Sequence, residues 1–292
     1  METVVKVRVG VVVTTIGRWE AVERLLASIS PTTAVAIANQ SGEPPPASIA
    51  RSGLVEFVTS FGGISRGRND AMKLLKGETE IIAFPNDHSH FQEDTISCAI
   101  SHFANEDPPG ALAGSLLEPA GIRFRVPKTG TSLTDWTVWR AIEPAMFIAS
   151  HLAETLKFRE DLGTGNSSPW QAGEGTDLLL RIMHAGYRVV AAPEVIVCSD
   201  GERRQLTPEE WRVKLRSYAR GTGYVLRLHD YGLFQSTMQI MLPWYRFVKV
   251  PTSGVRTPAR DCLEASLGRL EGRLGHCLAS GHLRLNEAAL KK

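Results

Sequence analysis

The sequence predicts an α/β fold with a mostly parallel central sheet flanked by helices, followed by a helical C-terminal region. In the N-terminal half, short β-branched runs alternate with amphipathic stretches, and parallel strands need such crossover connections. Beyond residue 200 the pattern becomes helical. Of the 292 residues, 43% are hydrophobic and 22% are charged, which is typical of a globular chain and excludes wholesale disorder.

The first strand is predicted at residues 7–14, a valine-rich run suited to a buried parallel strand. A turn at Gly17 leads into a helix at 19–29, where apolar residues recur at helical spacing. The following runs predict strands at 34–39, 54–59 and 80–84, and a helix at 65–75 that a pair of glycines introduces. Three prolines in the loop 41–48 exclude regular structure there.

The middle of the chain is less regular. It predicts helices at 94–104 and 174–185, extended segments at 111–117, 145–150 and 189–197, and a loop rich in Gly and Ser at 158–173. Three long helices are predicted at 208–228, 234–250 and 259–279, with Pro243 kinking or dividing the second. The chain exceeds the usual size of a single core, and we expect two parts, residues 1–200 and 201–292.

Charge is distributed unevenly along the chain. Residues 201–292 contain 16 Lys and Arg against 8 Asp and Glu, a net charge of +8, whereas residues 1–200 carry a net −6. This asymmetry indicates either an Arg-rich solvated surface or a basic region with a partner of its own. No run of 18 uncharged apolar residues occurs, which disfavours a membrane-spanning helix. The four cysteines lack C-x-x-C spacing, which fits a reducing cytoplasm.

The commoner nucleotide and metal motifs are missing from the sequence. A dinucleotide site needs G-x-G-x-x-G between the first strand and its helix, where this chain has Gly17 alone, and no P-loop motif occurs. His88 and His90 form an H-x-H pair. However, Gln92 and Glu93 stand where a metallo-β-lactamase-like site continues with Asp and His. These three classes are therefore disfavoured.

An ordered series of segments across residues 7–200 carries the functional signal. It consists of VVVTTIGRW at 11–19, FGGISRGRNDAM at 61–72, FPNDHSHF at 84–91 and GEGTDLLLRIMHAGYRVV at 173–190. The series resembles the inverting family 2 glycosyltransferases, which have the GT-A fold. SYARGTGY at 217–224 further resembles a helix of a bacterial subgroup of that family.

The resemblance implies a nucleotide diphosphate-sugar donor, bound by polar residues at the strand ends and at the entrance of the helix 65–75. The candidate donor-binding residues are Thr14, Thr15, Arg18, Asn39, Ser41, Arg66, Arg68, Asn69, Asn86 and Asp87. For Arg66 and Arg68 a solvated helix surface is the alternative.

The resemblance also implies a divalent cation, Mn²⁺ or Mg²⁺, held at an acidic motif. The positions of that motif are Asn86, Asp87 and His88, so one carboxylate of three remains. Asp87 and His88 are the expected metal ligands. Metal independence or a shifted ligand set is the alternative, because imidazole suits Mg²⁺ poorly.

An inverting transfer needs a general base for the acceptor hydroxyl. Glu174 and Asp177 share the first turn of a predicted helix, whose positive end favours their ionised forms. The resemblance places the base at the second position of a pair of adjacent acids, and Gly175 occupies that position here. We expect Glu174 to be the base and Asp177 its neighbour or an acceptor-binding group, unless both acids merely stabilise the helix. The loop before this helix, with Trp170 as a sugar-stacking platform, predicts a mobile acceptor lid.

The sequence therefore predicts an inverting glycosyltransferase acting on a glycan or lipid-linked acceptor of a bacterial envelope, with no nucleic-acid partner. One alternative is a degenerate, non-catalytic GT-A domain that binds nucleotide or glycan, because Asn86, His88, Gly175 and Ser199 replace functional side chains of relatives. A nucleotidyltransferase is disfavoured, since no glycine-rich basic loop follows the first strand.

The segment 234–250 combines apolar and aromatic residues with Arg246 and Lys249. It is too short and too polar to span a bilayer, but Trp and Tyr beside cations suit a membrane–water interface. We expect peripheral binding to an anionic surface at the inner face of a membrane. Packing on the catalytic domain or a homodimer interface is the alternative.

Overall fold

The computed structural model describes residues 7–50, 54–200, 206–249 and 258–278. The chain divides into two compact units. The first comprises Met1–Arg159 and Gly175–Glu202, and the second comprises Glu160–Glu174 and Arg203–Lys292. Residues 160–174 therefore group with the C-terminal helices, whereas the sequence suggested one boundary near residue 200.

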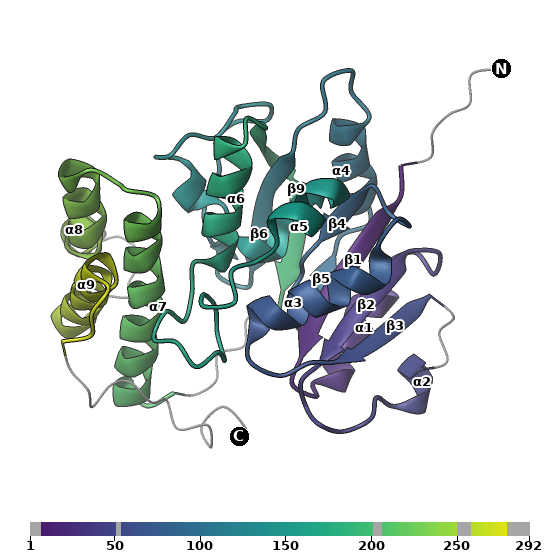
Figure 1. Cartoon of the computed structure of the whole chain (residues 1–292), viewed down its shortest axis with the longest axis horizontal. Helices are drawn as coiled ribbons and strands as arrows, with labels where there is room; N and C mark the ends of the chain where they lie inside the picture. The colour runs from purple at the N-terminus through teal and green to yellow at the C-terminus, as the bar shows by residue number, and fades with distance from the viewer. Residues whose placement is uncertain (1–6, 51–53, 201–205, 250–257, 279–292) are drawn as a thin grey trace. The chain divides into compact units, whose positions relative to one another are not determined.

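The first unit is built on one sheet with the strand order β3-β2-β1-β4-β8-β6-β9-β5, and β7 pairs with β6 (Figure 1). The strands are β1 (Val9–Thr15), β2 (Ala34–Asn39), β3 (Val55–Thr59), β4 (Ile81–Ala83), β5 (Ser89–Phe91), β6 (Ala111–Glu118), β7 (Gly121–Ile122), β8 (Met146–Ala149) and β9 (Val189–Ser199). Among the described residues, β5, β7 and β8 run against the direction of the other strands. The predicted α/β fold with a mostly parallel sheet is confirmed.

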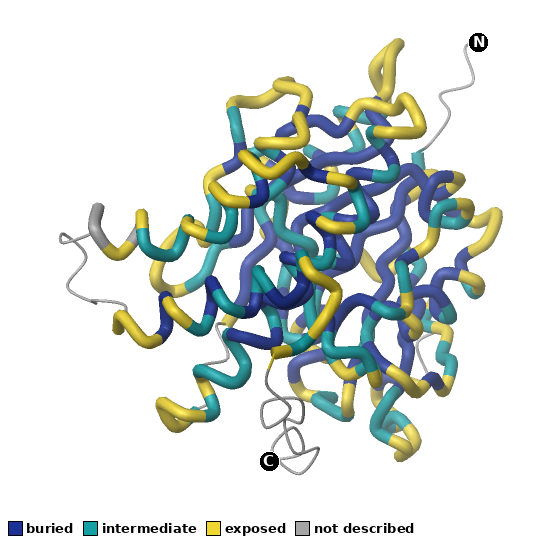
Figure 2. The backbone as a smooth tube through the Cα atoms, turned by 60° about the vertical axis from the view of Figure 1, so that its left-hand side comes forward, coloured by how far each residue is buried: buried dark blue, intermediate teal, exposed yellow. Residues whose placement is uncertain are grey.

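Helices connect the strands and pack on the sheet (Figure 1). They are α1 (Trp19–Ala27), α2 (Ala47–Ala50), α3 (Ile64–Met72), α4 (Thr95–Phe103), α5 (Ser150–Leu156) and α6 (Glu174–His184), with 3₁₀ turns at Lys73–Leu75, Val138–Arg140 and Glu143–Ala145. The central strands are buried, as the dark tube of Figure 2 shows, which explains why Val11, Val13 and Ile37 belong to continuous apolar runs.

Several elements of this unit were not predicted: α2, which begins at Ala47 inside the loop where regular structure was excluded, the two-residue strand β7, and also β5 and α5. β5 has three residues, too few for a recognisable period, and it exists because it pairs antiparallel with the end of β9. α5 begins at Ser150, directly where β8 ends. Both depend on contacts that are distant in sequence.

The second unit contains α7 (Pro208–Leu228), α8 (Leu233–Lys249) and α9 (Ala259–Leu274). α7 begins with a capping box in which Thr207 and Glu210 satisfy each other's backbone N–H groups. α9 ends earlier than predicted, because Gly275 adopts a φ of 71° and terminates the helix. The predicted end of the middle helix, Val250, lies outside the described residues.

Glycines allow α7 and α9 to pack closely. A Cβ on Gly223 would lie 2.0 Å from Arg269 O, and one on Gly272 would lie 2.0 Å from Arg220 O. A side chain at either position would push the two backbones apart. The R-G-x-G segment that the sequence singled out is thus a helix-packing motif in this structure.

α8 continues through Pro243, so the proline does not divide the helix. Proline lacks the N–H that would bond to the carbonyl of Gln239, four residues earlier. That carbonyl accepts a hydrogen bond from Arg269 Nη1 of α9, and Ser266 Oγ donates to the next carbonyl, Ile240 O, at 2.7 Å. Side chains of α9 therefore supply the bonding that the proline removes.

Candidate functional site

The first candidate site lies at the carboxyl ends of β1 and β4, which pair in parallel. The Thr15 hydroxyl donates to Asp87 Oδ2 at 2.9 Å, and Arg18 Nη1 lies 3.3 Å from Asp87 Oδ1. His88 Nδ1 lies 3.1 Å from the same oxygen. The structure thus gathers four of the predicted residues around one buried carboxylate, and we call Thr15, Arg18, Asp87 and His88 the Asp87 cluster.

A tight turn fixes the β1 side of this cluster. Gly17 has a φ of 99°, which favours glycine, and Thr15 Oγ1 accepts from the backbone N–H groups of Gly17 at 3.2 Å and Arg18 at 3.1 Å. The same hydroxyl donates to Asp87, so the turn and the carboxylate are held together. The predicted residue Thr14 lies on the other face of the strand, with its Cγ2 next to Gly67 of α3.

The turn that carries Asp87 begins at Asn86. It is half-buried, and its carbonyl accepts from the N–H of Ser89 at 3.0 Å. The turn brings Asp87 and His88 to the end of β4, which ends at Ala83.

An open pocket of about 410 Å³ lies at the carboxyl ends of β2 and β3. Its lining residues are Asn39, Gly42, Glu43, Pro44, Pro45, Phe57, Val58, Thr59 and Phe61. Phe61 is 57% exposed, although it is a large aromatic side chain. An exposed ring beside polar groups suits a flat ligand. The sequence analysis missed Phe61, the first residue of its own FGGISRGR segment.

Asn39 and Ser41 shape one wall of this pocket. Asn39 Oδ1 accepts from the Ser41 N–H at 3.0 Å and from the Ser41 hydroxyl at 2.7 Å, and Asn39 Nδ2 donates to Glu43 O at 2.6 Å. These bonds hold the proline-rich loop in place. Asn39 therefore lines the pocket, and Ser41 helps to hold the backbone of the loop that borders it.

The polar residues of α3 lie elsewhere. Asn69 exchanges two hydrogen bonds of 2.9 Å with the backbone of Phe158. Arg68 is fully buried, pairs with Glu143, and lies over the Phe158 ring at 5.3 Å. Arg66 is exposed beside Gly62, whose Cβ would lie 3.5 Å from Arg66 Nη1. Arg68 and Asn69 thus hold the backbone at Phe158 and the Glu143 carboxylate, a role that the sequence did not suggest.

The Asp87 cluster does not fit the divalent cation that the family resemblance implies. Such a site needs several oxygens open to the ion. Both Asp87 oxygens already accept from Thr15, Arg18 and His88. Asp200, the acid that follows β9, lies 3.1 Å from Arg24 Nη2 and 3.6 Å from His90 Nδ1 instead.

A different trio offers metal-ligating atoms. Cys98, His102 and Glu194 place one ligand atom each within 4.8 Å of one another, and this is the only such group among the described residues. A hydrogen bond of 2.8 Å between His102 Nε2 and Glu194 Oε1 accounts for two of its members. Burial, with Glu194 and Asp94 nearby, raises the pKa of the Cys98 thiol. The trio includes neither Asp87 nor His88.

The two acids at the start of α6 differ in their contacts. Asp177 is buried, and Arg181 holds it through Nε at 2.9 Å and Nη2 at 2.8 Å. Glu174 is 8% exposed. A Cβ on Gly175 would lie 3.1 Å from Glu143 Oε2. Glu143 is thus a third carboxylate against this helix turn, and sequence reasoning missed it because it is distant along the chain.

The loop before α6 is fixed on α7. Trp170 is 9% exposed and stacks on Tyr224, with ring centroids 4.6 Å apart and an angle of 10° between the planes. The Tyr224 hydroxyl donates to Asp161 Oδ2 at 3.3 Å, and a Cβ on Gly221 would lie 2.0 Å from Ala172 O. The expectation that Trp170 is an open sugar-stacking platform is wrong for this structure, because the ring is buried against Tyr224.

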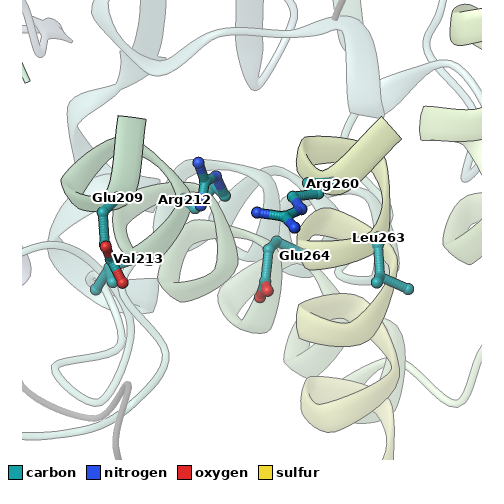
Figure 3. Close-up of a pocket in the computed structure, with 6 residues that line it drawn as sticks. All are labelled: Glu209, Arg212, Val213, Arg260, Leu263 and Glu264. Carbon is teal, nitrogen blue, oxygen red and sulfur yellow. The ribbon is translucent and has the colours of Figure 1, made fainter. Parts of the chain in front are cut away.

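A second pocket, of about 260 Å³, lies between α7 and α9 (Figure 3). It is lined by Glu209, Arg212, Val213, Arg260, Leu263 and Glu264. Figure 3 shows Arg212 and Arg260 reaching into the space between the helices, and Glu264 pairs with Arg216 at 2.9 Å. Two acids and two arginines balance in charge, so the pocket favours no ligand of one sign.

Beside this pocket the second unit contains a sealed ion cluster, which we call the Glu271 cluster. Arg216 binds Glu271 through Nε at 3.1 Å and Nη2 at 2.6 Å, and Arg220 Nε adds a contact of 2.6 Å. Burial alone would raise the pKa of Glu271, but the hydrogen bonds from Arg216 and Arg220 outweigh it and lower the pKa to about 2. The sequence analysis did not identify this cluster.

No protein-family model and no curated protein sequence matches the chain. Solved structures do match it. TarS 1-349 from S. aureus gives a TM-score of 0.52 at 14% identity, with 92% of each chain covered. The same protein in complex with UDP-GlcNAc gives 0.53 at 14% identity and the same coverage.

The mannosyltransferase PcManGT from Pyrobaculum calidifontis, solved with GDP-Man and Mn²⁺, gives a TM-score of 0.59 at 17% identity. The match covers 97% of this chain and 80% of that one. At such identities the likeness shows a shared fold. The fold is therefore the GT-A-like fold of proteins that have been solved with nucleotide sugars bound.

Proposed function

We propose that the protein is an inverting glycosyltransferase that moves a sugar from a nucleotide diphosphate-sugar to an acceptor hydroxyl. One observation carries the proposal: the pocket beside Phe61 and the Asp87 cluster lie at the carboxyl ends of adjacent parallel strands of one sheet. Ligands of open α/β sheets bind at that edge. The solved structures that share the fold include complexes with UDP-GlcNAc and GDP-Man.

In this proposal the pocket at the ends of β2 and β3 takes the nucleoside. Phe61 stacks on the base, and the loop held by Asn39 and Ser41 contacts the ribose. The strand order β3-β2-β1-β4 then directs the phosphates along the sheet edge toward the Asp87 cluster. Arg66 adds a cation at the entrance of α3.

The proposed general base is Glu174. An acceptor hydroxyl must lose its proton as it attacks the anomeric carbon, and a carboxylate is a suitable acceptor for that proton. Asp177 is tied to Arg181, which favours a role in positioning the helix turn. Glu143, beside Gly175, is the second candidate for the base.

The test is turnover with UDP-, GDP- and dTDP-sugars, scored by release of the nucleoside diphosphate. Glu174→Gln keeps the shape and removes the base, so turnover should fall by about 10²-fold or more while donor binding is retained. Asp177→Asn and Glu143→Gln are the matched comparisons. If one of these is inactive while Glu174→Gln is active, that residue is the base.

Two outcomes of this test would favour one of the two alternative functions that the sequence left open. Donor binding without any turnover would favour a non-catalytic GT-A domain that binds nucleotide or glycan. Consumption of a nucleoside triphosphate would favour a nucleotidyltransferase. Either result would contradict the proposed transfer.

The proposed acceptor is a glycan or lipid-linked saccharide at the cytoplasmic face of a bacterial membrane. The supporting observation is an exposed apolar stripe on α8, formed by Phe234, Met238, Met241 and Tyr245, which are 50–73% exposed. Their spacing of four, three and four residues places them on one helix face. In the part of the chain that the structure describes, no helix is long and apolar enough to cross a membrane.

The opposite face of α8 packs on α9 through Ser236, Ile240 and Pro243. The stripe therefore points away from α9, and residues 201–292 carry a net charge of +8. An apolar stripe on a basic region suits an anionic lipid surface.

Cosedimentation tests this membrane contact. We expect binding to phosphatidylglycerol vesicles, no binding to phosphatidylcholine vesicles, and loss of binding at high salt or in Met238→Glu/Met241→Glu. Failure to bind at low salt would contradict it. A stable dimer of the chain that the same double variant dissociates would then identify the stripe as a homodimer interface.

A further inference from the structure

The Asp87 cluster indicates a way to stabilise a leaving diphosphate without a divalent cation. Asp87 is 5% exposed, and its two oxygens accept contacts from Thr15, Arg18 and His88. A metal ion on this carboxylate would displace one of these donors. It would also lie close to the Arg18 guanidinium, whose positive charge repels it.

Arg18 is held from both ends. Its backbone N–H donates to Thr15 Oγ1 at 3.1 Å, and its guanidinium lies 3.3 Å from Asp87 Oδ1. The Arg18 side chain is 26% exposed, against 7% for Asp87. Its charge therefore lies between a buried carboxylate and the solvent.

The position on the sheet fits the ligand chemistry. Arg18 follows β1, and β1 lies between β2, which borders the pocket, and β4, which leads to Asp87. A nucleoside in the pocket therefore has its phosphates near the end of β1. Guanidinium groups bind phosphate oxygens through paired N–H groups, and arginine stays charged at any working pH.

We propose that Arg18, positioned by Asp87 and Thr15, binds the diphosphate of the donor and neutralises it during transfer in place of a divalent cation. This assignment rests on the proposed function. In the step, the bond between the anomeric carbon and the diphosphate oxygen breaks, and its electron pair stays on that oxygen. The acceptor oxygen forms the new bond to the anomeric carbon, and its proton passes to the carboxylate base. Arg18 stabilises the charge that the diphosphate gains.

The test compares wild type, Arg18→Met and Arg18→Lys with the control Arg24→Met. Arg24 lies on the exposed side of α1, where it pairs with Asp200, and no proposed donor contact involves it. Two readouts are needed: transfer with EDTA or with added Mn²⁺, and calorimetric binding of UDP or GDP against the matching nucleoside, also with EDTA.

In EDTA the wild type should keep its transfer rate and bind UDP or GDP more tightly than the nucleoside. Arg18→Met should lose about 10²–10³-fold in transfer and lose the preference for the diphosphate, while nucleoside binding stays unchanged. Arg18→Lys should fall between them, because a lysine keeps the charge and loses the paired donors. Arg24→Met should behave as wild type.

Wild-type transfer or diphosphate binding that EDTA abolishes and Mn²⁺ restores would overturn the assignment of Arg18 while leaving the transferase standing. An Arg18→Met protein that keeps its diphosphate preference would also overturn it. Binding of neither the diphosphates nor the nucleosides would overturn the proposed function and this assignment together. Metal-free diphosphate binding that depends on Arg18, without transfer, would support the diphosphate contact and contradict catalysis.

Discussion

The Asp87 cluster and the Glu271 cluster are built from the same chemical groups and differ in what surrounds them. Glu271 is fully buried, and the side chains of Arg216 and Arg220 are 7% and 1% exposed. In the Asp87 cluster the acid is buried, but the Arg18 side chain is 26% exposed. A sealed cluster has its charges satisfied internally and serves to hold helices together. The half-open cluster leaves part of the Arg18 side chain exposed, and in our proposal this part binds the donor diphosphate.

The largest expected effect comes from breaking the sealed cluster. Glu271→Gln removes the charge of the buried carboxylate that both Arg216 and Arg220 contact and leaves Arg216 with Glu264, which should destabilise the second unit by about 3–5 kcal/mol. Asp87→Asn is the matched change at the half-open cluster and should abolish transfer with a much smaller loss of stability. Denaturant unfolding followed by tryptophan fluorescence measures both. Equal destabilisation by the two variants would contradict the distinction between the clusters.

The dependence of the unfolding free energy on acidic pH is a second test of the difference between the two clusters. The pKa of Glu271 is about 2 in the folded protein, below the value of about 4.3 expected for an unfolded chain. A lowered folded pKa stabilises the protein above the unfolded pKa, and this stability is lost as the pH falls from about 4.3 to about 2. Unfolding free energies measured across this window should fall more steeply in wild type than in Glu271→Gln. Parallel curves would refute the assignment.

The packing of the loop before α6 on α7 gives a smaller effect. Gly221→Ala places a Cβ 2.0 Å from the carbonyl oxygen of Ala172, so the backbone must shift. A destabilisation of about 1–3 kcal/mol is expected. Gly232→Ala is the control, because the nearest atom to its Cβ is 4.0 Å away. Thermal unfolding of the two variants should differ clearly, and a Gly221→Ala protein as stable as the control would show that the contact yields easily.

The smallest effect on stability is expected from a change at the partner of an exposed carboxylate. Hydrogen bonds from the backbone and side chain of Thr207 lower the pKa of Glu210 at the start of α7. Thr207→Ala removes one half of this capping box and should destabilise α7 by about 1 kcal/mol. Circular dichroism during thermal unfolding measures the change. If Thr207→Ala lost as much stability as Glu271→Gln, the difference in exposure between Glu210 and Glu271 would not explain their contributions to stability.

Much of the fold follows from local patterns. The valine-rich run at 7–14 and the apolar stretch 34–39 predict buried strands, the helical pattern at 208–228 predicts a long helix, and the structure has β1, β2 and α7 there. β5 does not follow from a local pattern, because its three residues become a strand only through pairing with β9. The discontinuous second unit has the same origin: nothing near Trp170 in sequence indicates that Tyr224 will cover it.

The sequence predicts which residues lie at the ends of the strands. It does not predict which partner each side chain of the candidate site contacts. Thr15 and Asp87 follow adjacent parallel strands, so their meeting could be expected. Arg68 and Asn69 belong to the same motif, but they bind Glu143 and Phe158, which are far along the chain. A motif can thus give the neighbourhood of a site without giving the contact of each side chain.

The second unit is assembled from two stretches of chain that α6 and β9 separate. During synthesis Trp170 is made well before Tyr224, and Ala172 before Gly221, so residues 160–174 have no helix to pack on until α7 has been completed. Such non-local contacts form late, because the intervening loop must first be closed. The stretch that leads into Glu174 can therefore complete its packing only after α7 has been synthesised.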